Sequence, residues 1–231
     1  MEQILNIDKP FGWSSTDVVR KIKPMLGRAK LPKNTKIGHA GTLDPLATGV
    51  LIICIGKATK QVEQLQAQSK EYEFTIELGA TTASFDLEHP VDARYPWEHI
   101  TREMAENAVA ALVGEQQQVP PVYSAKRIDG KRAYEYARGD QPVEMRVAQI
   151  TIYAAEIMDF TPPFLKLRVE CSKGTYVRSL ARDLGVELGS GGYLTELRRT
   201  RSGEYHASDG MSIEQVENFF AALETITPQN T

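Results

Sequence analysis

The tightest local constraint in this 231-residue chain is the segment Gly38–Gly49, which places three glycines and one proline around the carboxylate of Asp44. It leads directly into an apolar run, Val50–Ile55, which predicts a buried strand. Pro45 fixes its own backbone and biases Asp44 toward an extended conformation. Such a turn can present a nucleophile or a base, but Asp-Pro also commonly opens an ordinary turn. The local pattern leaves both interpretations open.

The composition is that of a globular protein, with 42% hydrophobic and 25% charged residues. The sequence contains no apolar run of membrane-spanning length and no signal-peptide pattern at its N-terminus, so we expect a cytoplasmic protein. Cys54 and Cys171 lie in apolar runs without CxxC spacing, which predicts buried free thiols. The four histidines are scattered, and no phosphate-binding glycine fingerprint follows a strand. We therefore expect neither a metal nor another cofactor.

Charge is segregated along the chain. Residues 18–43 hold seven lysines or arginines and no acid, whereas residues 61–117 hold eleven acids against three bases. Further basic clusters follow, at Lys126-Arg127, Lys131-Arg132, Lys173, Arg178, Arg182 and Arg198-Arg199-Arg201. Any one run can be a solvated face, but several together favour a surface that meets a polyanion.

Periodicity predicts helices alternating with strands, and therefore an α+β fold. The expected helices are 13–26, 58–66, 101–113 and 212–223, and the expected strands are 50–55, 70–78, 147–160, 164–172 and 193–200. Ser14 and Asp17 form a capping-box pattern for the first helix, which Pro24 should bend or shorten. Thr175 is the expected cap of a further helix after residue 174, and Ser212 with Gln215 is the expected capping box of the last helix.

Basic and aromatic residues interleave between Val119 and Gly139, where a short helix is expected at 132–138. This composition suits contacts to phosphates and unstacked bases. An ordinary surface loop with aromatic anchors is the alternative.

Six motifs in this order resemble the TruB family of pseudouridine synthases, which make pseudouridine at position 55 in the T-loop of tRNA. They span residues 3–203 and comprise Lys9–Ser15, Gly38–Gly49, Lys70–Tyr72, Val119–Ala125 with Gly130–Tyr134 after it, Gly174–Arg178 and Leu197–Arg199. The resemblance implies a pseudouridine synthase fold, with a central, mostly antiparallel mixed sheet flanked by helices. It also implies a catalytic domain over 1–203, with an RNA-binding insertion at about 119–142. Many members of the family carry a C-terminal RNA-binding domain after this core, and here the sequence departs from that pattern. We expect residues 204–231 to form a short C-terminal extension that ends in a helix, without a separate RNA-binding domain.

The resemblance also implies residue roles. Asp44 matches the aspartate that starts cleavage of the N-glycosidic bond, either by attacking the ribose C1′ or through a glycal. Tyr72 matches the tyrosine that stacks on the target base and is the candidate for removing the C5 proton. Arg178 matches an arginine that pairs with the aspartate, although it can equally contact a phosphate. The implied substrate-binding residues are His39, Tyr176, Leu197, Lys9, Lys126 and Arg198.

The implied reaction needs no cofactor. It requires the uridine to be flipped out of its loop, at a cost of a few kcal/mol, and tRNA binding that weakens with salt. The expected partner is the T-arm of tRNA, with no membrane, no obligate protein partner and a monomeric protein. An RNA-folding chaperone is the alternative; a hydrolase that uses Asp44 with a second acid ranks lower, because no second carboxylate lies in the matching motifs.

Overall fold

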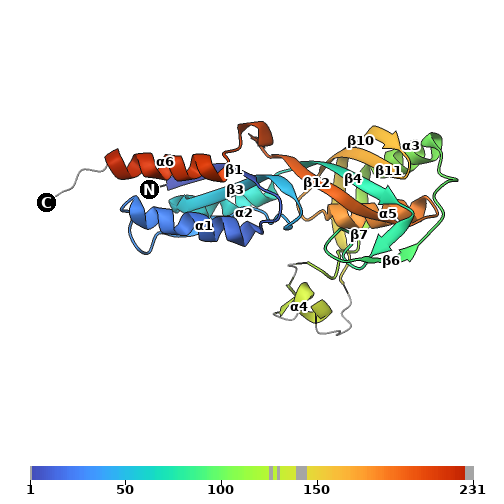
Figure 1. The fold of residues 1–231 in the computed structure, drawn as a ribbon, viewed down its shortest axis with the longest axis horizontal. Helices are drawn as coiled ribbons and strands as arrows, with labels where there is room; N and C mark the ends of the chain where they lie inside the picture. The colour runs from blue at the N-terminus through green and yellow to red at the C-terminus, as the bar shows by residue number, and fades with distance from the viewer. Residues whose placement is uncertain (1, 125–126, 129–130, 139–144, 227–231) are drawn as a thin grey trace. The chain divides into compact units, whose positions relative to one another are not determined.

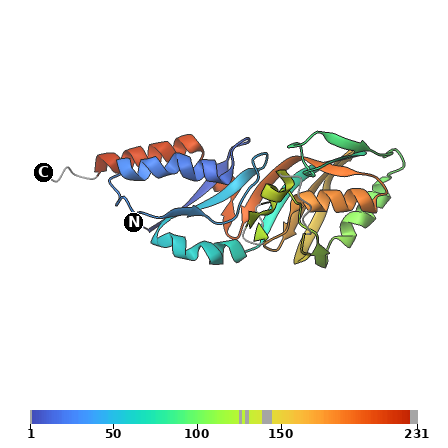
Figure 2. The same ribbon diagram turned by 90° about the horizontal axis from the view of Figure 1, so that it is seen from below.

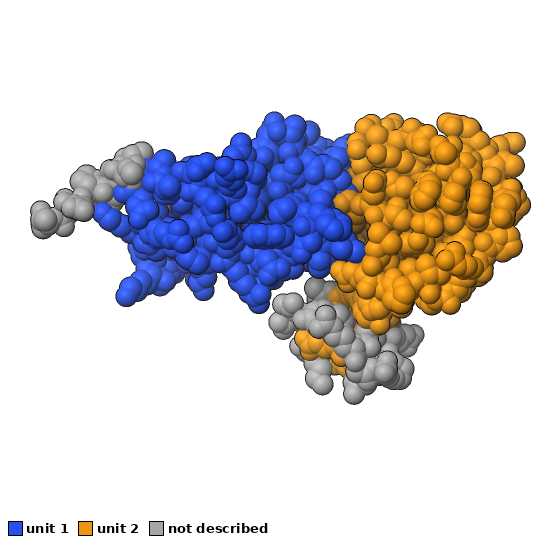
Figure 3. All heavy atoms as spheres, viewed as in Figure 1, with its two compact units in different colours: residues 1–71, 198–231 blue, residues 72–197 orange. Residues whose placement is uncertain are grey.

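The computed structural model of the protein describes residues 2–124, 127–128, 131–138 and 145–226 (Figure 1). The chain forms two compact units, of which unit 1 holds residues 1–71 and 198–231 and unit 2 holds residues 72–197 (Figure 3). Two strands contain the points where the chain passes from one unit to the other, β4 (Lys70–Leu78) and β12 (Gly192–Ser202). The residues expected to form a C-terminal extension belong to unit 1 as far as they are described.

Unit 1 is built around the buried strand predicted from the apolar run. Its elements are β1 (Glu2–Lys9), α1 (Ser15–Arg28), β2 (Ile37–His39), β3 (Thr48–Gly56), the 3-10 helix η1 (Lys57–Gln61), α2 (Val62–Ala67), β13 (Tyr205–His206), the 3-10 helix η2 (Ala207–Asp209) and α6 (Ile213–Ile226). Strand β3 pairs antiparallel with β1, from Glu2 opposite Gly56 to Lys9 opposite Gly49, and antiparallel with β2. The end of β12 runs parallel to β3, with Arg198 opposite Thr48.

Helices cover both faces of the unit 1 strands. Helices α1 and α6 lie side by side on one face, and α2 lies on the other (Figure 2). The predicted capping boxes are confirmed at the start of both long helices, where Ser14 with Asp17 and Ser212 with Gln215 exchange hydrogen bonds. The expected shortening by Pro24 is wrong. Helix α1 continues to Arg28, because Met25 and Leu26 bury their side chains in the core.

Unit 2 contains the remaining strands and helices. These are β5 (Ala80–Thr82), β6 (Val91–Arg94), α3 (Arg102–Ala111), β7 (Gly114–Gln118), β8 (Arg127–Ile128), β9 (Lys131–Arg132), α4 (Ala133–Arg138), β10 (Ala148–Thr161), β11 (Phe164–Cys171) and α5 (Val177–Glu187). The strand order within the unit is β12, β4, β11, β10, β7, and β10 pairs antiparallel with both neighbours. Strand β4 alternates buried and half-buried residues over its whole length, as predicted.

Two short hairpins complete unit 2. Strands β5 and β6 form one antiparallel pair, and β8 with β9 forms another, directly before α4. This second hairpin and α4 lie within the segment expected to be an insertion, where the short helix predicted at 132–138 is confirmed at Ala133–Arg138. The strand pairs of the protein are mostly antiparallel, with a parallel pair between β3 and β12, so the predicted α+β class is confirmed.

The start of α5 differs from the expected one. Tyr176, not Thr175, occupies the capping position, and its side chain makes no capping hydrogen bond. The side chain of Gln118 takes over this role from β7. Its Oε1 accepts from the Tyr176 N–H at 2.9 Å, and its Nε2 donates to the Tyr176 carbonyl at 3.2 Å. Thr175 instead donates its hydroxyl to the Ser172 carbonyl, 3.0 Å away.

Both cysteines are buried free thiols, as predicted. Desolvation raises the pKa of Cys54 above its usual value. Over the described residues, the helices are too short or too polar to cross a bilayer.

We predict that Gly185→Ala destabilises the protein by about 2 kcal/mol, as measured by urea unfolding. A Cβ on this α5 residue would lie 2.4 Å from the Gly192 nitrogen, and a backbone atom cannot rotate away. This clash outweighs the helix-propensity gain of about 1 kcal/mol. Gly27→Ala in α1 is the control, because its Cβ would meet nothing within 4 Å and should stabilise. Equal effects of the two substitutions would contradict the close packing of α5.

Candidate active site

The Gly38–Gly49 segment connects β2 to β3 within unit 1 and carries Asp44 as a half-buried side chain. The turn after it is closed by the Ala47 N–H, which donates to the Asp44 carbonyl at 3.1 Å. Gly41 and Gly49 have φ angles of 105° and 100°, a region that favours glycine. The predicted stiff turn is therefore present, with a glycine at each end of its tight part.

Arg199 fixes the backbone on both sides of this turn from the far end of the sequence. Its side chain is buried, with 2% of the residue exposed. Nε donates to the Val50 carbonyl at 2.7 Å, and the two Nη atoms donate to the carbonyls of Gly41 at 3.1 Å and Thr42 at 3.4 Å. A buried guanidinium is tolerated when such acceptors replace water. The loop and strand β12 are thus held together by one side chain.

Lys9 fixes the other side of the loop. Its residue is fully buried, and Nζ donates to the carbonyls of Trp13 at 2.5 Å, Pro10 at 3.0 Å and Pro45 at 3.3 Å. Desolvation lowers the pKa of Lys9 to about 8, although the nearby Asp44 carboxylate acts in the opposite direction and raises it. Lys9 was predicted to bind substrate; its ammonium points into the protein and contacts the residue after Asp44.

Ser15 completes the anchoring of the loop. Its hydroxyl accepts from the Leu43 N–H at 2.8 Å and donates to the Leu43 carbonyl at 3.0 Å. The Gly12 N–H donates to the Pro45 carbonyl at 2.9 Å. The residues immediately before and after Asp44 are therefore both tied to the N-terminal segment. Rigid anchoring of this kind suits a group that must meet a reacting atom in one geometry.

We predict that Gly49→Ala destabilises the protein by at least about 3 kcal/mol in chemical unfolding. A Cβ here would lie 2.1 Å from the Arg199 carbonyl oxygen, on a residue whose φ is positive. Gly38→Ala in the same segment is the control, since its Cβ would meet nothing within 4 Å and should change stability by less than about 0.5 kcal/mol. A mild effect at Gly49 would show that the loop can move away from β12.

The lowered pKa of Lys9 predicts a pH dependence of stability. Between about 8 and the ordinary value of 10.5, unfolded chains keep a proton that the folded protein has lost, so the free energy of unfolding rises with pH. The contribution is constant below about pH 8, and its slope above that is at most about 1.4 kcal/mol per pH unit. Unfolding titrations of wild type and Lys9→Met at several pH values isolate it. A wild-type minus variant difference that stays flat to pH 10.5 would contradict the assignment.

Two other predicted site residues belong to unit 1. His39 is the last residue of β2, is half-buried, and lies opposite Ile53 of β3. The Arg198 guanidinium forms a bidentate ion pair with Asp8, in which Nη1 and Nη2 donate to the two carboxylate oxygens at 3.0 and 2.9 Å. It also donates to the Thr48 hydroxyl. Its side chain is 40% exposed, so a phosphate that bound there would compete with Asp8.

Arg178 lies in unit 2, in the first turn of α5, and is buried with 3% exposed. Its Nη1 donates to the Ser84 carbonyl at 3.3 Å, and its Nε lies 3.6 Å from Oδ2 of Asp86, a carboxylate that is also buried. Asp86 is fixed in turn, because its Oδ1 accepts from the Ser84 hydroxyl at 2.5 Å and from the Glu88 N–H at 2.9 Å. The pairing of Arg178 with Asp44 stays a prediction.

The remaining predicted residues of unit 2 lie on three elements. Tyr72 is buried on β4, at 9% exposed, Tyr176 is half-buried at the start of α5, and Leu197 is half-buried on β12. Lys126 lies outside the described residues. Among those described, no group of three histidine, cysteine, aspartate or glutamate side chains is arranged to hold a metal ion.

Sequence reasoning missed the part that Asp86, Arg199 and Ser15 play. Asp86 lies in the acidic stretch 61–117 and was not singled out from the sequence, yet it is 4% exposed and lies beside Arg178. The available signal was local: Ser84 and Asp86 are spaced for a side-chain hydrogen bond that stabilises a turn. No comparable signal marks Arg199, whose acceptors are backbone carbonyls about 150 residues away.

Two family models match the chain. Residues 28–177 match the model of the TruB family pseudouridylate synthase N-terminal domain, and residues 178–228 match that of the tRNA pseudouridylate synthase B C-terminal domain. Curated relatives cover nearly the whole chain. It is 52% identical over 212 residues to tRNA pseudouridine synthase B of Phocaeicola vulgatus, with 92% of the chain and 90% of the relative covered. It is 51% identical over 217 residues to that of Parabacteroides distasonis, with 94% and 92% covered.

Solved structures agree in fold. The chain matches a protein in the crystal structure of a Cbf5-Nop10-Gar1 complex with a TM-score of 0.71 and 28% identity, covering 94% of this chain and 54% of that one. A chain in the structure of an H/ACA RNP bound to a substrate RNA containing 2'-deoxyuridine gives a TM-score of 0.69 and 26% identity, covering 98% and 56%. The protein thus spans about half the length of these solved chains.

Proposed function

Since the chain belongs to the TruB family of pseudouridylate synthases and is a tRNA pseudouridine synthase, we propose that it isomerises uridine 55 in the T-loop of tRNA. The observation that carries this proposal is the anchored loop of unit 1. Lys9, Ser15 and Arg199 fix the backbone around Asp44 and leave its side chain half-buried at the turn. A carboxylate held in this way is prepared for one substrate geometry.

In the proposed reaction the uridine is flipped out of the T-loop and Asp44 acts at the sugar. The N1–C1′ bond breaks, the freed uracil turns, and a C5–C1′ bond forms. A proton leaves C5 and one is gained at N1, so substrate and product are isomers and no redox partner or activated group is consumed. Asp44 serves as the nucleophile at C1′ or promotes departure of the base through a glycal.

Tyr72 and Arg178 have supporting roles in this proposal. Tyr72 stacks on the extruded base and takes the C5 proton. Arg178 favours the charged form of the catalytic aspartate, as a neighbouring cation does for a carboxylate. Asp86 and Ser84 hold Arg178 in one position, which preorganises the guanidinium. The substrate is the T-arm of tRNA, and because tRNA is the substrate we place the reaction in the cytoplasm, without a protein partner.

We predict that Asp44→Asn releases tritium from tRNA labelled at uridine C5 at less than about one thousandth of the wild-type rate. This corresponds to a loss of about 4 kcal/mol in transition-state stabilisation. The measurement is single-turnover tritium release from an unmodified transcript, followed by mapping of the modified position. Asp209→Asn is the control, because Asp209 is an exposed carboxylate in the same unit.

Four outcomes decide between the functions. Release from position 55 alone supports the proposal, and release from another uridine overturns the assigned site. Full activity of Asp44→Asn removes Asp44 from the chemistry. Tight tRNA binding by wild type without any tritium release favours the RNA-folding chaperone instead.

A further inference from the structure

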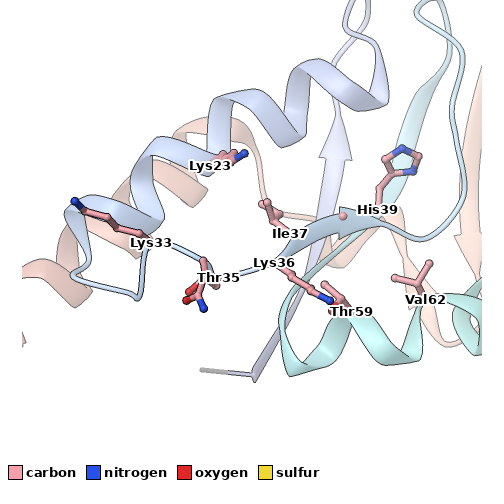
Figure 4. Close-up of a pocket in the computed structure, with 10 residues that line it drawn as sticks. Lys23, Lys33, Thr35, Lys36, Ile37, His39, Thr59 and Val62 are labelled. Carbon is pink, nitrogen blue, oxygen red and sulfur yellow. The ribbon is translucent and has the colours of Figure 1, made fainter.

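A basic depression lies on unit 1 between α1, the segment after it, β2 and η1 (Figure 4). Its volume is about 490 Å³. Three lysines line it, Lys23, Lys33 and Lys36, together with the hydroxyl-bearing Thr35 and Thr59. His39 also lines it, on the opposite side from Lys33 in Figure 4. The proposed chemistry at Asp44 uses none of the three lysines.

The lysines are carried by a backbone that is itself fixed. Helix α1 ends through Lys30, whose φ is 56°, and the next residue closes the helix end by donating from Leu31 N–H to the Leu26 carbonyl at 3.0 Å. Residues 32–35 form a tight turn, in which the Thr35 N–H and hydroxyl both donate to the Pro32 carbonyl, at 2.9 and 2.7 Å. The Lys36 carbonyl accepts from the Gly56 N–H at 2.8 Å, at the edge of the sheet. The backbone that carries Lys33 and Lys36 is therefore held in place without a ligand.

The charge of these lysines is not balanced within the described part of the chain. Lys23, Lys33 and Lys36 are all exposed, and none lies within 4.0 Å of a carboxylate there. Lys21, two residues from Lys23, forms an ion pair with Glu217 at 2.6 Å, and Arg198 is paired with Asp8. Like charges gathered in one hollow repel each other and attract a ligand with several negative charges.

We propose that this depression binds backbone phosphates of the tRNA substrate, with Lys33 and Lys36 as the main phosphate contacts and Lys23 beside them. The inference rests on the proposed function. RNA is favoured over an acidic protein because the depression continues to His39, five residues before Asp44 and on the same strand-and-turn segment. The hydroxyls of Thr35 and Thr59 already donate to the carbonyls of Pro32 and Gly56, so the lysines supply the donors to a phosphate. An RNA strand seated here would reach the loop that carries the catalytic carboxylate.

The double variant Lys33→Gln/Lys36→Gln tests the proposal. Each lost phosphate contact lowers the slope of log K against log salt by about 0.7–0.9, so the double variant should lose about 1.4–1.8 of slope and about 25- to 60-fold in tRNA affinity near 0.1 M salt. Fluorescence anisotropy with a labelled, unmodified tRNA transcript at several salt concentrations measures both quantities. Lys33→Arg/Lys36→Arg should keep the wild-type affinity.

The matched control is Arg94→Gln/Lys166→Gln, which removes the same charge from unit 2 at residues outside the depression and outside the proposed site. Its affinity and slope should equal those of wild type. If both double variants lose the same tRNA affinity, the effect comes from net charge alone and the proposal is overturned. The proposal is also overturned if Lys33→Gln/Lys36→Gln binds tRNA with the affinity and the salt slope of wild type. The proposal also fails if that variant loses binding of inorganic phosphate or of an acidic protein while its tRNA binding stays unchanged.

Tritium release by wild type separates this proposal from the proposed function. If wild type shows lysine-dependent tRNA binding but releases no tritium, the phosphate site stands and the proposed function falls. If wild type modifies position 55 but Lys33→Gln/Lys36→Gln leaves tRNA binding intact, the function stands and the phosphate site falls.

Discussion

Burial of the Arg199 guanidinium against the Gly38–Gly49 loop is the constraint on which unit 1 depends. Moving an unpaired cation out of water costs several kcal/mol, so Arg199 is stable there only while the carbonyls of Gly41, Thr42 and Val50 accept its protons. The same carbonyls would themselves lack a partner if Arg199 left. The turn around Asp44, the start of β3 and strand β12 therefore stabilise one another, although about 150 residues separate the turn from Arg199.

Short-range patterns predicted most of the elements because their physics is local. A capping box needs two residues three apart, and both Ser14 and Ser212 head one. Alternation along β4 follows from the two-residue repeat of a strand, whose one face is buried. A local pattern also explains the error at α5. Thr175 is a good capping residue by type, but the side chain that bonds the start of this helix is Gln118, which comes from the distant strand β7.

The internal positions of the cations could not be predicted in this way. Lysine and arginine are almost never fully buried, so neither burial was expected. Lys9 was predicted to bind substrate from the family resemblance, and Arg199 was counted in a basic cluster that favours a surface facing a polyanion. Their partners are backbone carbonyls, which every residue carries and no pattern distinguishes. Asp86 was hidden for a related reason, because its burial depends on Arg178 from a helix about 90 residues later.

This division of the cations changes which basic cluster can attract RNA. In the basic cluster Arg198-Arg199-Arg201, Arg199 donates to buried backbone carbonyls and Arg198 is neutralised by Asp8. Arg201 donates to the Gly203 carbonyl. An arginine paired with a carboxylate attracts an approaching polyanion only weakly, because its positive charge and the negative charge of its partner largely cancel at a distance. Salt screens what remains beyond a Debye length of about 8 Å. Lys33 and Lys36 have no carboxylate within 4.0 Å among the described residues. Lys33 and Lys36 lie where the chain enters the Asp44 loop, so their uncompensated charge is the reason for which we propose that the substrate's phosphates bind on this side of unit 1.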